Sequence, residues 1–229
     1  MFDGNWREAV EKAVDPIGAS LKRAGVSADV LTITGIVVAA AGAVVVGNGY
    51  LRLGFVFLLL SGLPDLLDGA VAKAAGTTSL RGAFFDSVSD RVSDAFLFGG
   101  LAWYLASNNP GRISMLPVAV MAAAMLISYE RAKAESLGFD AKGGIMERAE
   151  RFIAVSVGLV FPEILIPVLW VMLVLTLVTA GQRFVKVWRQ ATTAGTNLPT
   201  PRRRPRPSTR DVGQSTTRRR NRRNRSDAR

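Results

Sequence analysis

Long stretches without a charged side chain limit what this chain can fold into more than any other feature of its sequence. Two of them, at residues 30–51 and 164–182, are long enough to span a bilayer unaided, since about 20 helical residues cross its apolar core. Four shorter uncharged runs adjoin segments with few charges; they are 53–64, 95–111, 113–129 and 152–162. We therefore predict an all-α fold, an integral membrane bundle of six transmembrane helices. Their expected ranges are 29–49, 53–75, 81–107, 112–136, 147–162 and 164–189.

The positive charge of the chain is concentrated at its C-terminal end. Twelve arginines and two aspartates after residue 195 supply nearly all of the formal net charge of +11. This segment is rich in Pro, Ser and Thr, so we expect residues 193–229 to form a disordered, Arg-rich cytoplasmic tail. Its arginines are suited to anionic lipid headgroups. We expect no nucleic-acid partner, because the tail lacks interleaved aromatic residues on which bases could stack.

The distribution of Lys and Arg also predicts an orientation. If both ends of the six-helix bundle are cytoplasmic, only Arg52 and Arg112 remain on the opposite side. We therefore expect a multi-pass protein of the plasma membrane with both termini cytoplasmic. Apolar residues at helical spacing between charged ones predict an interfacial amphipathic helix over residues 1–25, with a cytosolic helix packed on protein as the alternative. The transmembrane domain would then span residues 26–192.

The chain contains neither cysteine nor histidine. A disulfide framework, a thiolate metal site and an imidazole base are therefore excluded. Any proton transfer falls to carboxylates or water, and any metal ion must be held by oxygen ligands.

Four aspartates lie near the cytoplasmic ends of two consecutive predicted helices. Asp65 and Asp68 are three residues apart, and Asp86 and Asp90 are four apart, so each pair shares one helix face. Carboxylates at membrane depth are costly unless they are paired or solvated, and four together repel one another. A divalent cation, or two, bound between the helices resolves this conflict. The alternative is that these aspartates cap helices or pair with neighbouring basic side chains.

The segment from Asp65 to Asp90 resembles the signature of the CDP-alcohol phosphotransferase family, D-x-x-D-G-x-x-A-R, eight residues, then G-x-x-x-D-x-x-x-D. Every fixed position matches except the arginine, which is Lys73 here and lacks a bidentate guanidinium. The resemblance implies that Asp65, Asp68 and Asp86, helped by Asp90, hold two Mg²⁺ or Mn²⁺ ions that bind the pyrophosphate of CDP-diacylglycerol. It also implies that Asp90 is the general base for the acceptor hydroxyl and that CMP leaves.

The same resemblance implies nucleotide contacts in two places. One lies within and just after the first half of the motif, at Gly69, Lys73 and Ser79. The other is the segment that enters the first long helix, formed by Asp29, Val30, Leu31 and Thr32. Without the resemblance, Asp29 is explained about equally well as the N-cap of that helix.

A second group of polar residues occurs at the predicted cytoplasmic helix ends. The pattern S-Y-x-x-A-x-A-E from Ser128, then a Gly-containing turn and E-R-x-E-R, resembles the bacterial phosphatidylinositol phosphate synthases of the same family. This resemblance implies that inositol 1-phosphate is the acceptor. Its expected ligands are Ser128, Arg131, Arg148, Arg151 and Arg183. An acceptor that carries phosphate needs several cations, whereas a neutral alcohol does not. Basic residues here also satisfy the positive-inside rule without a ligand, which is how we interpret Lys142 and Arg189.

Three alternatives remain at this point. The same chemistry with glycerol 3-phosphate as acceptor would make the protein a phosphatidylglycerophosphate synthase, because that acceptor is also anionic. A divalent-cation transporter would also carry intramembrane aspartates, although nearer the midplane and on broken helices. A membrane tether whose arginine tail binds nucleic acid is the third alternative. Dimerisation is implied by the family resemblance alone.

Overall fold

The computed structural model describes residues 20, 23, 25–75, 79–109 and 111–195, without the side chains of residues 65, 66, 68–70 and 72–75. The chain divides into two units, Met1–Ala191 and Thr192–Arg229, and the first contains the helical bundle. Nearly all of the predicted interfacial helix at 1–25 lies outside the described residues, as does the predicted tail beyond residue 195.

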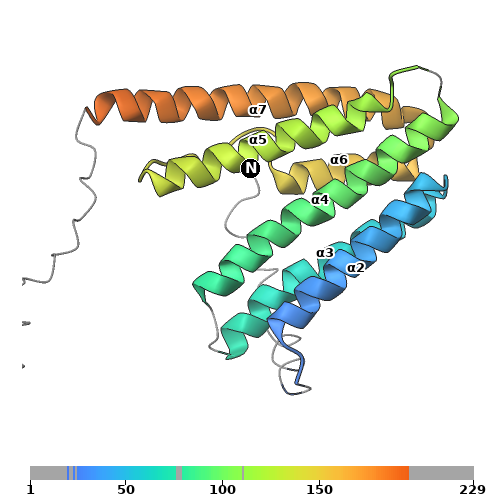
Figure 1. The fold of residues 1–229 in the computed structure, drawn as a ribbon, viewed down its shortest axis with the longest axis horizontal. Helices are drawn as coiled ribbons and strands as arrows, with labels where there is room; N and C mark the ends of the chain where they lie inside the picture. Colours follow the sequence, from blue (N-terminus) through green and yellow to red (C-terminus); the bar gives the residue numbers. More distant parts are fainter. Residues whose placement is uncertain (1–19, 21–22, 24, 76–78, 110, 196–229) are drawn as a thin grey trace, which may run out of the picture. The chain divides into compact units, whose positions relative to one another are not determined.

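Within the described residues the fold is all-helical, as predicted (Figure 1). Six α-helices follow one another along this part of the chain, and a short 3-10 helix, η1 (Pro162–Ile164), precedes the last. The helices are α2 (Ala28–Gly47), α3 (Leu51–Ala75), α4 (Leu80–Asn108), α5 (Met115–Ser136), α6 (Arg148–Val160) and α7 (Leu165–Thr193). Each of the six predicted helical segments coincides with one of them.

Helix ends differ from the predicted ends by a few residues, for local reasons. The helix α2 ends at Gly47 rather than at 49, because Asn48 and Gly49 form the turn into α3, in which Gly49 has a φ of +90°. The helix α5 begins at Met115 rather than at 112, after a turn that contains Gly111 at a φ of +84°. The helix α7 extends to Thr193, beyond the predicted end at 189.

Three of the described helical segments are long and apolar enough to cross a membrane, judged by length and composition. They are Ala28–Gly47, Met115–Ser136 and Pro162–Thr193. A shorter apolar stretch, Leu51–Pro64, forms the first part of α3. The other two helices do not meet this criterion, because α4 carries five charged residues in its first half and α6, with 13 residues, is too short. The number of six transmembrane spans therefore stays a prediction.

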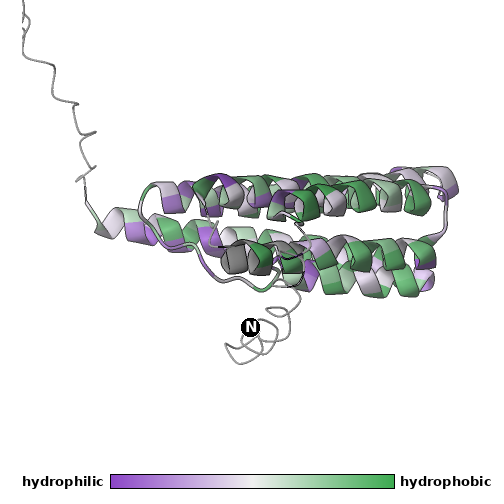
Figure 2. Cartoon of the chain, turned by 90° about the horizontal axis from the view of Figure 1, so that it is seen from below, coloured by the Kyte–Doolittle hydropathy of each residue, from purple (hydrophilic) through white to green (hydrophobic). Residues whose placement is uncertain are grey.

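Large apolar side chains are exposed on these helices. Along α7, for example, Trp170, Val174 and Leu177 are each more than half exposed, at 52%, 55% and 52%. Figure 2 shows that hydrophobic residues occur along much of the length of the helices. Soluble monomers rarely expose so much contiguous apolar surface, so these faces are suited to lipid or to another protein.

Glycines allow α2 to approach both of its neighbours closely. The helix α2 packs against α3 and α4, which lie beside it (Figure 1). A Cβ atom added at Gly42 would lie 2.8 Å from Cβ of Phe57 on α3. At Gly100 of α4, an added Cβ would lie 2.6 Å from the main-chain oxygen of Ala43 on α2. The three helices therefore pack closely, as small residues permit in membrane bundles.

This packing predicts opposite effects for two adjacent alanine substitutions in α4. Gly100→Ala should destabilise the fold by about 1–3 kcal/mol, because the new methyl group meets the main chain of α2. Gly99→Ala is the matched control: nothing lies within 4 Å of its added Cβ, and alanine favours a helix by up to about 1 kcal/mol over glycine. Thermal unfolding in detergent should give a lower midpoint for the first variant only. Equal midpoints would contradict the close packing.

Candidate active site

A small cavity lies where α2, α3, α4 and α6 meet. Its volume is about 20 Å³. It contains four residues predicted to have functional roles, namely Thr32, Asp86, Asp90 and Arg148. Its other lining residues are Gly35, Ile36, Ser61, Pro64, Ser89 and Ser93. The structure thus brings together predicted nucleotide, metal and acceptor ligands from three different helices.

The motif aspartates of α4 lie on one face of that helix. Asp86 and Asp90 are one turn apart, and both line the small cavity. The side chain of Asp90 is only 18% exposed, and its Oδ1 lies 2.9 Å from Nη2 of Arg148. Its Oδ2 lies 3.2 Å from Nη1 of Arg91, the next residue. The candidate base is therefore half-buried and held by cations.

The other half of the motif lies on α3. Asp65, Asp68, Gly69 and Lys73 are in the C-terminal part of this helix, directly after Pro64, which lines the small cavity. Their side chains are outside the described part of the chain. Among the side chains that are described, no group of three acidic residues gathers around a possible metal position. The pair Asp86 and Asp90 nevertheless fits a hard divalent cation, because its donors are carboxylate oxygens and the α3 motif residues follow a lining residue.

Asp29 and Ser79, one residue from each predicted nucleotide group, lie at neighbouring helix ends. Asp29 does not cap α2: Ser27 does, and its hydroxyl accepts the N–H of Val30 at 3.3 Å. Asp29 instead pairs with Arg81 at 2.6 Å, which joins the first turns of α2 and α4. Ser79 caps α4 by accepting the N–H of Gly82 at 3.0 Å. Arg81 was not singled out from the sequence, because only the fold places it beside Asp29.

Thr32 completes the first of these groups. Its hydroxyl donates to the main-chain oxygen of Ala28 at 3.1 Å, and the residue lines the small cavity. Val30 is 52% exposed and Leu31 is partly buried. Of the four predicted residues 29–32, only Thr32 lines this cavity.

Two of the predicted acceptor ligands are held side by side at the start of α6. Nη1 of Arg148 donates to the main-chain oxygen of Asp90 at 2.9 Å and to Oδ1 of Asp94 at 3.2 Å. Nη2 of Arg151 lies 3.4 Å from Oδ2 of Asp94, and its Nη1 donates to the main-chain oxygen of Met146 at 3.4 Å. Sequence reasoning missed Asp94, although it lies four residues after Asp90 and so continues the same acidic helix face.

Arg183, another predicted acceptor ligand, contacts the loop before α6 and the main chain of α5. Arg183 is 4% exposed and donates to the main-chain oxygens of Gly143 and Ile127, at 3.0 and 3.1 Å. Its Nη2 also lies 2.9 Å from Oε1 of Glu147, the residue before Arg148. Arg183 therefore binds the loop that precedes α6, through Gly143 and through Glu147, the last residue before the helix.

The two predicted ligands on α5 lie toward the C-terminal end of that helix. The hydroxyl of Ser128 donates to the main-chain oxygen of Ala124 at 3.0 Å. Arg131 is exposed and pairs with Glu135, one turn later, at 3.0 Å.

The loop from 137 to 147, which leads into α6, is fixed on α7. The hydroxyl of Thr179 accepts the N–H groups of Ile145 and Met146 at 3.2 and 3.0 Å. Gly144 has a φ of +149°, and a side chain at this position would collide with Thr179. At the other end of the loop, Asp140 lies 2.8 Å from Nζ of Lys186. The position of the α6 arginines therefore depends on α7.

The Asp140 contact predicts a pH-dependent loop. Hydrogen bonds from the Lys186 ammonium and from the main-chain N–H of Lys142 lower the pKa of Asp140 below its ordinary value of 3.8. A lowered carboxyl pKa stabilises the folded loop above pH 3.8, and this stabilisation is lost as the pH falls through the lowered pKa. Above pH 3.8, residues 138–146 should exchange their amide hydrogens more slowly in the wild type than in Asp140→Asn at the same pH. The difference should vanish below the lowered pKa. Identical exchange in both proteins at neutral pH would contradict this contact.

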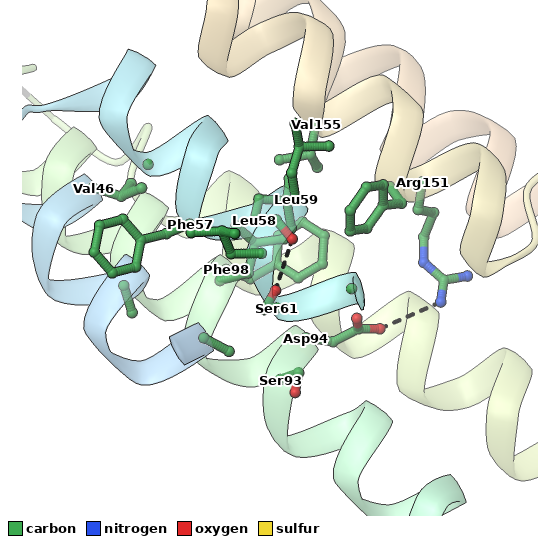
Figure 3. Close-up of a pocket in the computed structure, with 18 of the residues that line it drawn as sticks. Val46, Phe57, Leu58, Leu59, Ser61, Ser93, Asp94, Phe98, Arg151 and Val155 are labelled. Atoms are coloured by element: carbon green, nitrogen blue, oxygen red, sulfur yellow. Dashed lines mark hydrogen bonds and ion pairs between the residues drawn. The ribbon is translucent and has the colours of Figure 1, made fainter. Parts of the chain in front are cut away.

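A much larger cavity adjoins the small one. Its volume is about 780 Å³, and residues of α2, α3, α4 and α6 line it. Most of its lining is apolar, including Phe57, Leu58, Phe98 and Val155 (Figure 3). Its polar lining residues are Ser61, Ser93, Asp94, Arg148 and Arg151, of which Ser61, Ser93 and Arg148 also line the small cavity. An apolar space thus lies directly beside the half-buried carboxylates and the arginine pair.

Comparison with known proteins decides the family. The sequence model of CDP-alcohol phosphatidyltransferase matches residues 26–188, which include every one of these site residues. The chain belongs to the CDP-alcohol phosphatidyltransferase family. It is therefore an enzyme, a transferase of phospholipid biosynthesis.

Several relatives support this assignment. The phosphatidylinositol phosphate synthase of Mycobacterium marinum is 34% identical over 80% of this chain and 82% of its own length. The archaetidylinositol phosphate synthase of Methanothermobacter thermautotrophicus is 34% identical over 81% and 93%. The crystal structure of the Mycobacterium tuberculosis phosphatidylinositol phosphate synthase with CDP-DAG bound has a TM-score of 0.73 and 33% identity, covering 77% of this chain and 94% of that one.

Two general properties follow for this CDP-alcohol phosphatidyltransferase, the use of a divalent metal and a place in the membrane. A second crystal structure of the Mycobacterium tuberculosis enzyme holds manganese and citrate, with a TM-score of 0.71, 34% identity and coverage of 76% and 88%. Together with the family, this indicates use of a divalent metal, in agreement with the carboxylates of α4. The apolar helices and the family also indicate a membrane protein.

Proposed function

We propose that this enzyme is a phosphatidylinositol phosphate synthase, which transfers the phosphatidyl group of CDP-diacylglycerol to inositol 1-phosphate and releases CMP. The observation that carries the proposal is the continuous contact from Asp90 through Arg148 and Asp94 to Arg151. The candidate base Asp90 thereby lies against the guanidinium of Arg148, and Asp94 links this group to the guanidinium of Arg151. This arrangement suits an acceptor that carries both a hydroxyl and a phosphate.

The metal-binding part of the proposal rests on the aspartate motif. Asp65 and Asp68 of α3, with Asp86 and Asp90 of α4, would hold two Mg²⁺ or Mn²⁺ ions. When bound, such ions neutralise negative charge on a pyrophosphate during phosphoryl transfer. We assign nucleotide contacts to Gly69, Lys73 and Ser79 and to residues 29–32. The Asp29–Arg81 pair supports the part of this assignment that concerns Ser79 and residues 29–32, because it joins the first turn of α2 to the first turn of α4, which Ser79 caps.

The chemical step assigns one role to each part of the site. The acceptor hydroxyl oxygen forms a bond to the β-phosphorus of CDP-diacylglycerol, and the pyrophosphate bond to CMP breaks. Asp90 accepts the hydroxyl proton. Arg148 and Arg151, with Ser128, Arg131 and Arg183, would hold the acceptor phosphate and ring. Fixing the acceptor against Asp90 lowers the entropic cost of bringing the reacting groups together.

The membrane part of the proposal rests on the large cavity and the apolar helices. The 780 Å³ cavity is apolar and lies beside the carboxylates, so it suits the diacylglycerol part of the donor. We infer six transmembrane spans in the plasma membrane with both termini cytoplasmic, supported by the Lys/Arg distribution. We also infer a homodimer, supported by the family and by the exposed apolar faces, and an Arg-rich tail that contacts anionic lipid.

An acceptor panel tests the proposed function. Purified full-length protein with CDP-diacylglycerol and Mg²⁺ should release CMP rapidly with inositol 1-phosphate and at least about 100-fold more slowly with unphosphorylated inositol, because the arginine pair then lacks a ligand. Faster turnover with glycerol 3-phosphate would instead make the enzyme a phosphatidylglycerophosphate synthase. Equal rates with inositol and its phosphate would contradict the role of the arginines.

A further inference from the structure

Asp94 occupies a central place in the site that the aspartate motif does not explain. It lies on α4 one turn beyond Asp90, and its side chain is 16% exposed. Both of its carboxylate oxygens contact arginines of α6: Oδ1 lies 3.2 Å from Nη1 of Arg148, and Oδ2 lies 3.4 Å from Nη2 of Arg151. Figure 3 shows the second contact at the polar end of the large cavity.

The two arginines need such a partner for electrostatic reasons. They are three residues apart on one helix face, so their like charges repel. They also lie in the first turn of α6, where the helix dipole disfavours cations. The side chain of Arg151 is moreover 6% exposed, and a cation so deeply buried is costly unless it is paired. A carboxylate between them offsets all three effects.

We propose that Asp94 is a positioning residue that holds the guanidinium groups of Arg148 and Arg151 side by side for the phosphate of the acceptor. The proposal rests on the proposed function, because it assigns the arginines to an anionic acceptor. A guanidinium carries five N–H groups, which is more than the contacts with Asp94 use. Both arginines line the large cavity, and Arg148 also contacts Asp90. The clamp by Asp94 therefore fixes where the acceptor phosphate lies relative to the candidate base.

Two roles of Asp94 predict opposite changes in the acceptor KM when its charge is removed: a nearby negative charge only, and a residue that positions the arginines. If Asp94 acted only as a nearby negative charge, it would repel an incoming phosphate, and Asp94→Asn would lower the KM for the acceptor. If it positions the arginines, the same change lets them separate and raises that KM. The two effects can therefore be distinguished by the direction of a single measured value.

The experiment is steady-state kinetics of full-length Asp94→Asn in both substrates. We expect the KM for inositol 1-phosphate to rise by about 10-fold, with the KM for CDP-diacylglycerol within about 2-fold of the wild-type value. Glu163→Gln is the matched control, since it neutralises a carboxylate on η1, outside both cavities, and should change neither constant. A lower or unchanged acceptor KM, or an equal rise in both KM values, would overturn the proposal.

A double-mutant cycle tests whether Asp94 acts through the arginines. In an Arg151→Ala background, Asp94→Asn should raise the acceptor KM by clearly less than it does in the wild type. Additive effects would show that Asp94 does not act through Arg151 and would overturn the proposal. Thermal stabilisation of each variant by inositol 1-phosphate alone gives a second readout that needs no turnover, and Asp94→Asn should reduce it.

Two further measurements cover the cases in which Asp94→Asn does not fold or the acceptor is glycerol 3-phosphate. If Asp94→Asn does not fold, Asp94→Glu retains the charge on a longer side chain, and the expected result is the same change in direction: a higher acceptor KM with an unchanged donor KM. A wild-type acceptor KM in that variant would overturn the proposal. If the wild type instead uses glycerol 3-phosphate, the proposed function fails, but the Asp94 test is read on the KM for that acceptor.

Discussion

Asp90→Asn is expected to lower the rate of phosphatidyl transfer by about 1,000-fold, the middle of the range for losing a general base. Asparagine nearly preserves the shape of the side chain but cannot accept the hydroxyl proton. It would also weaken the contact at 2.9 Å with Arg148, because it removes the negative charge. The measurement is CMP release from CDP-diacylglycerol with saturating inositol 1-phosphate and Mg²⁺.

The control for this variant neutralises another carboxylate, Glu163 of η1, which is exposed and lies outside both cavities. Glu163→Gln should keep turnover close to the wild-type rate. Near-normal turnover in Asp90→Asn would exclude Asp90 as the base. Recovery of activity at high Mg²⁺ would show instead that Asp90 acts mainly by holding metal.

Arg151→Ala is expected to raise the KM for inositol 1-phosphate by about 100-fold, with a much smaller effect on the KM for CDP-diacylglycerol. The substitution removes a charge-assisted contact to phosphate and leaves Asp94 with one arginine fewer, and losing one member of a buried charge pair is strongly unfavourable. Arg151→Lys should give an intermediate KM, because lysine keeps the charge but lacks the planar fork. Initial rates at varied acceptor concentration measure both values.

Arg189→Ala is the matched control for this prediction. Arg189 is exposed near the end of α7, where we interpret it as a residue of the positive-inside pattern without a ligand role. Its removal should leave both KM values unchanged. An unchanged acceptor KM in Arg151→Ala would remove that residue from the acceptor site and weaken the case for an anionic acceptor.

The sequence predicted the helices well and their detailed ends less well. All six predicted segments are helices within the described residues. The long apolar runs among them favour helices, because a helix satisfies its own backbone hydrogen bonds where no water is present. The ends depend on single residues. Asp29 is a good cap by residue type, but Ser27 caps α2, since its hydroxyl reaches the N–H of Val30 and Asp29 is drawn to Arg81.

The candidate site was only partly accessible from the sequence. Asp86, Asp90 and Thr32 were predicted from motifs, and they line one cavity. The roles of Asp94 and Arg81 were not, because each depends on a partner more than 50 positions away in the chain. Arg183 was predicted as a ligand of the acceptor, and this role stays a prediction. What the structure shows is that Arg183 binds the loop before α6 through Gly143 and Glu147.

By itself, the sequence determined the helical class, the approximate helix ranges and the chemical type of the site, because these depend on local apolar length and on the spacing of carboxylates along one helix. The tertiary structure decided which charges face one another. The start of α6 is brought against α4, so that Arg148 meets Asp90 and both arginines meet Asp94. Such pairings depend on the packing of helices that are distant in the chain, which no local pattern encodes.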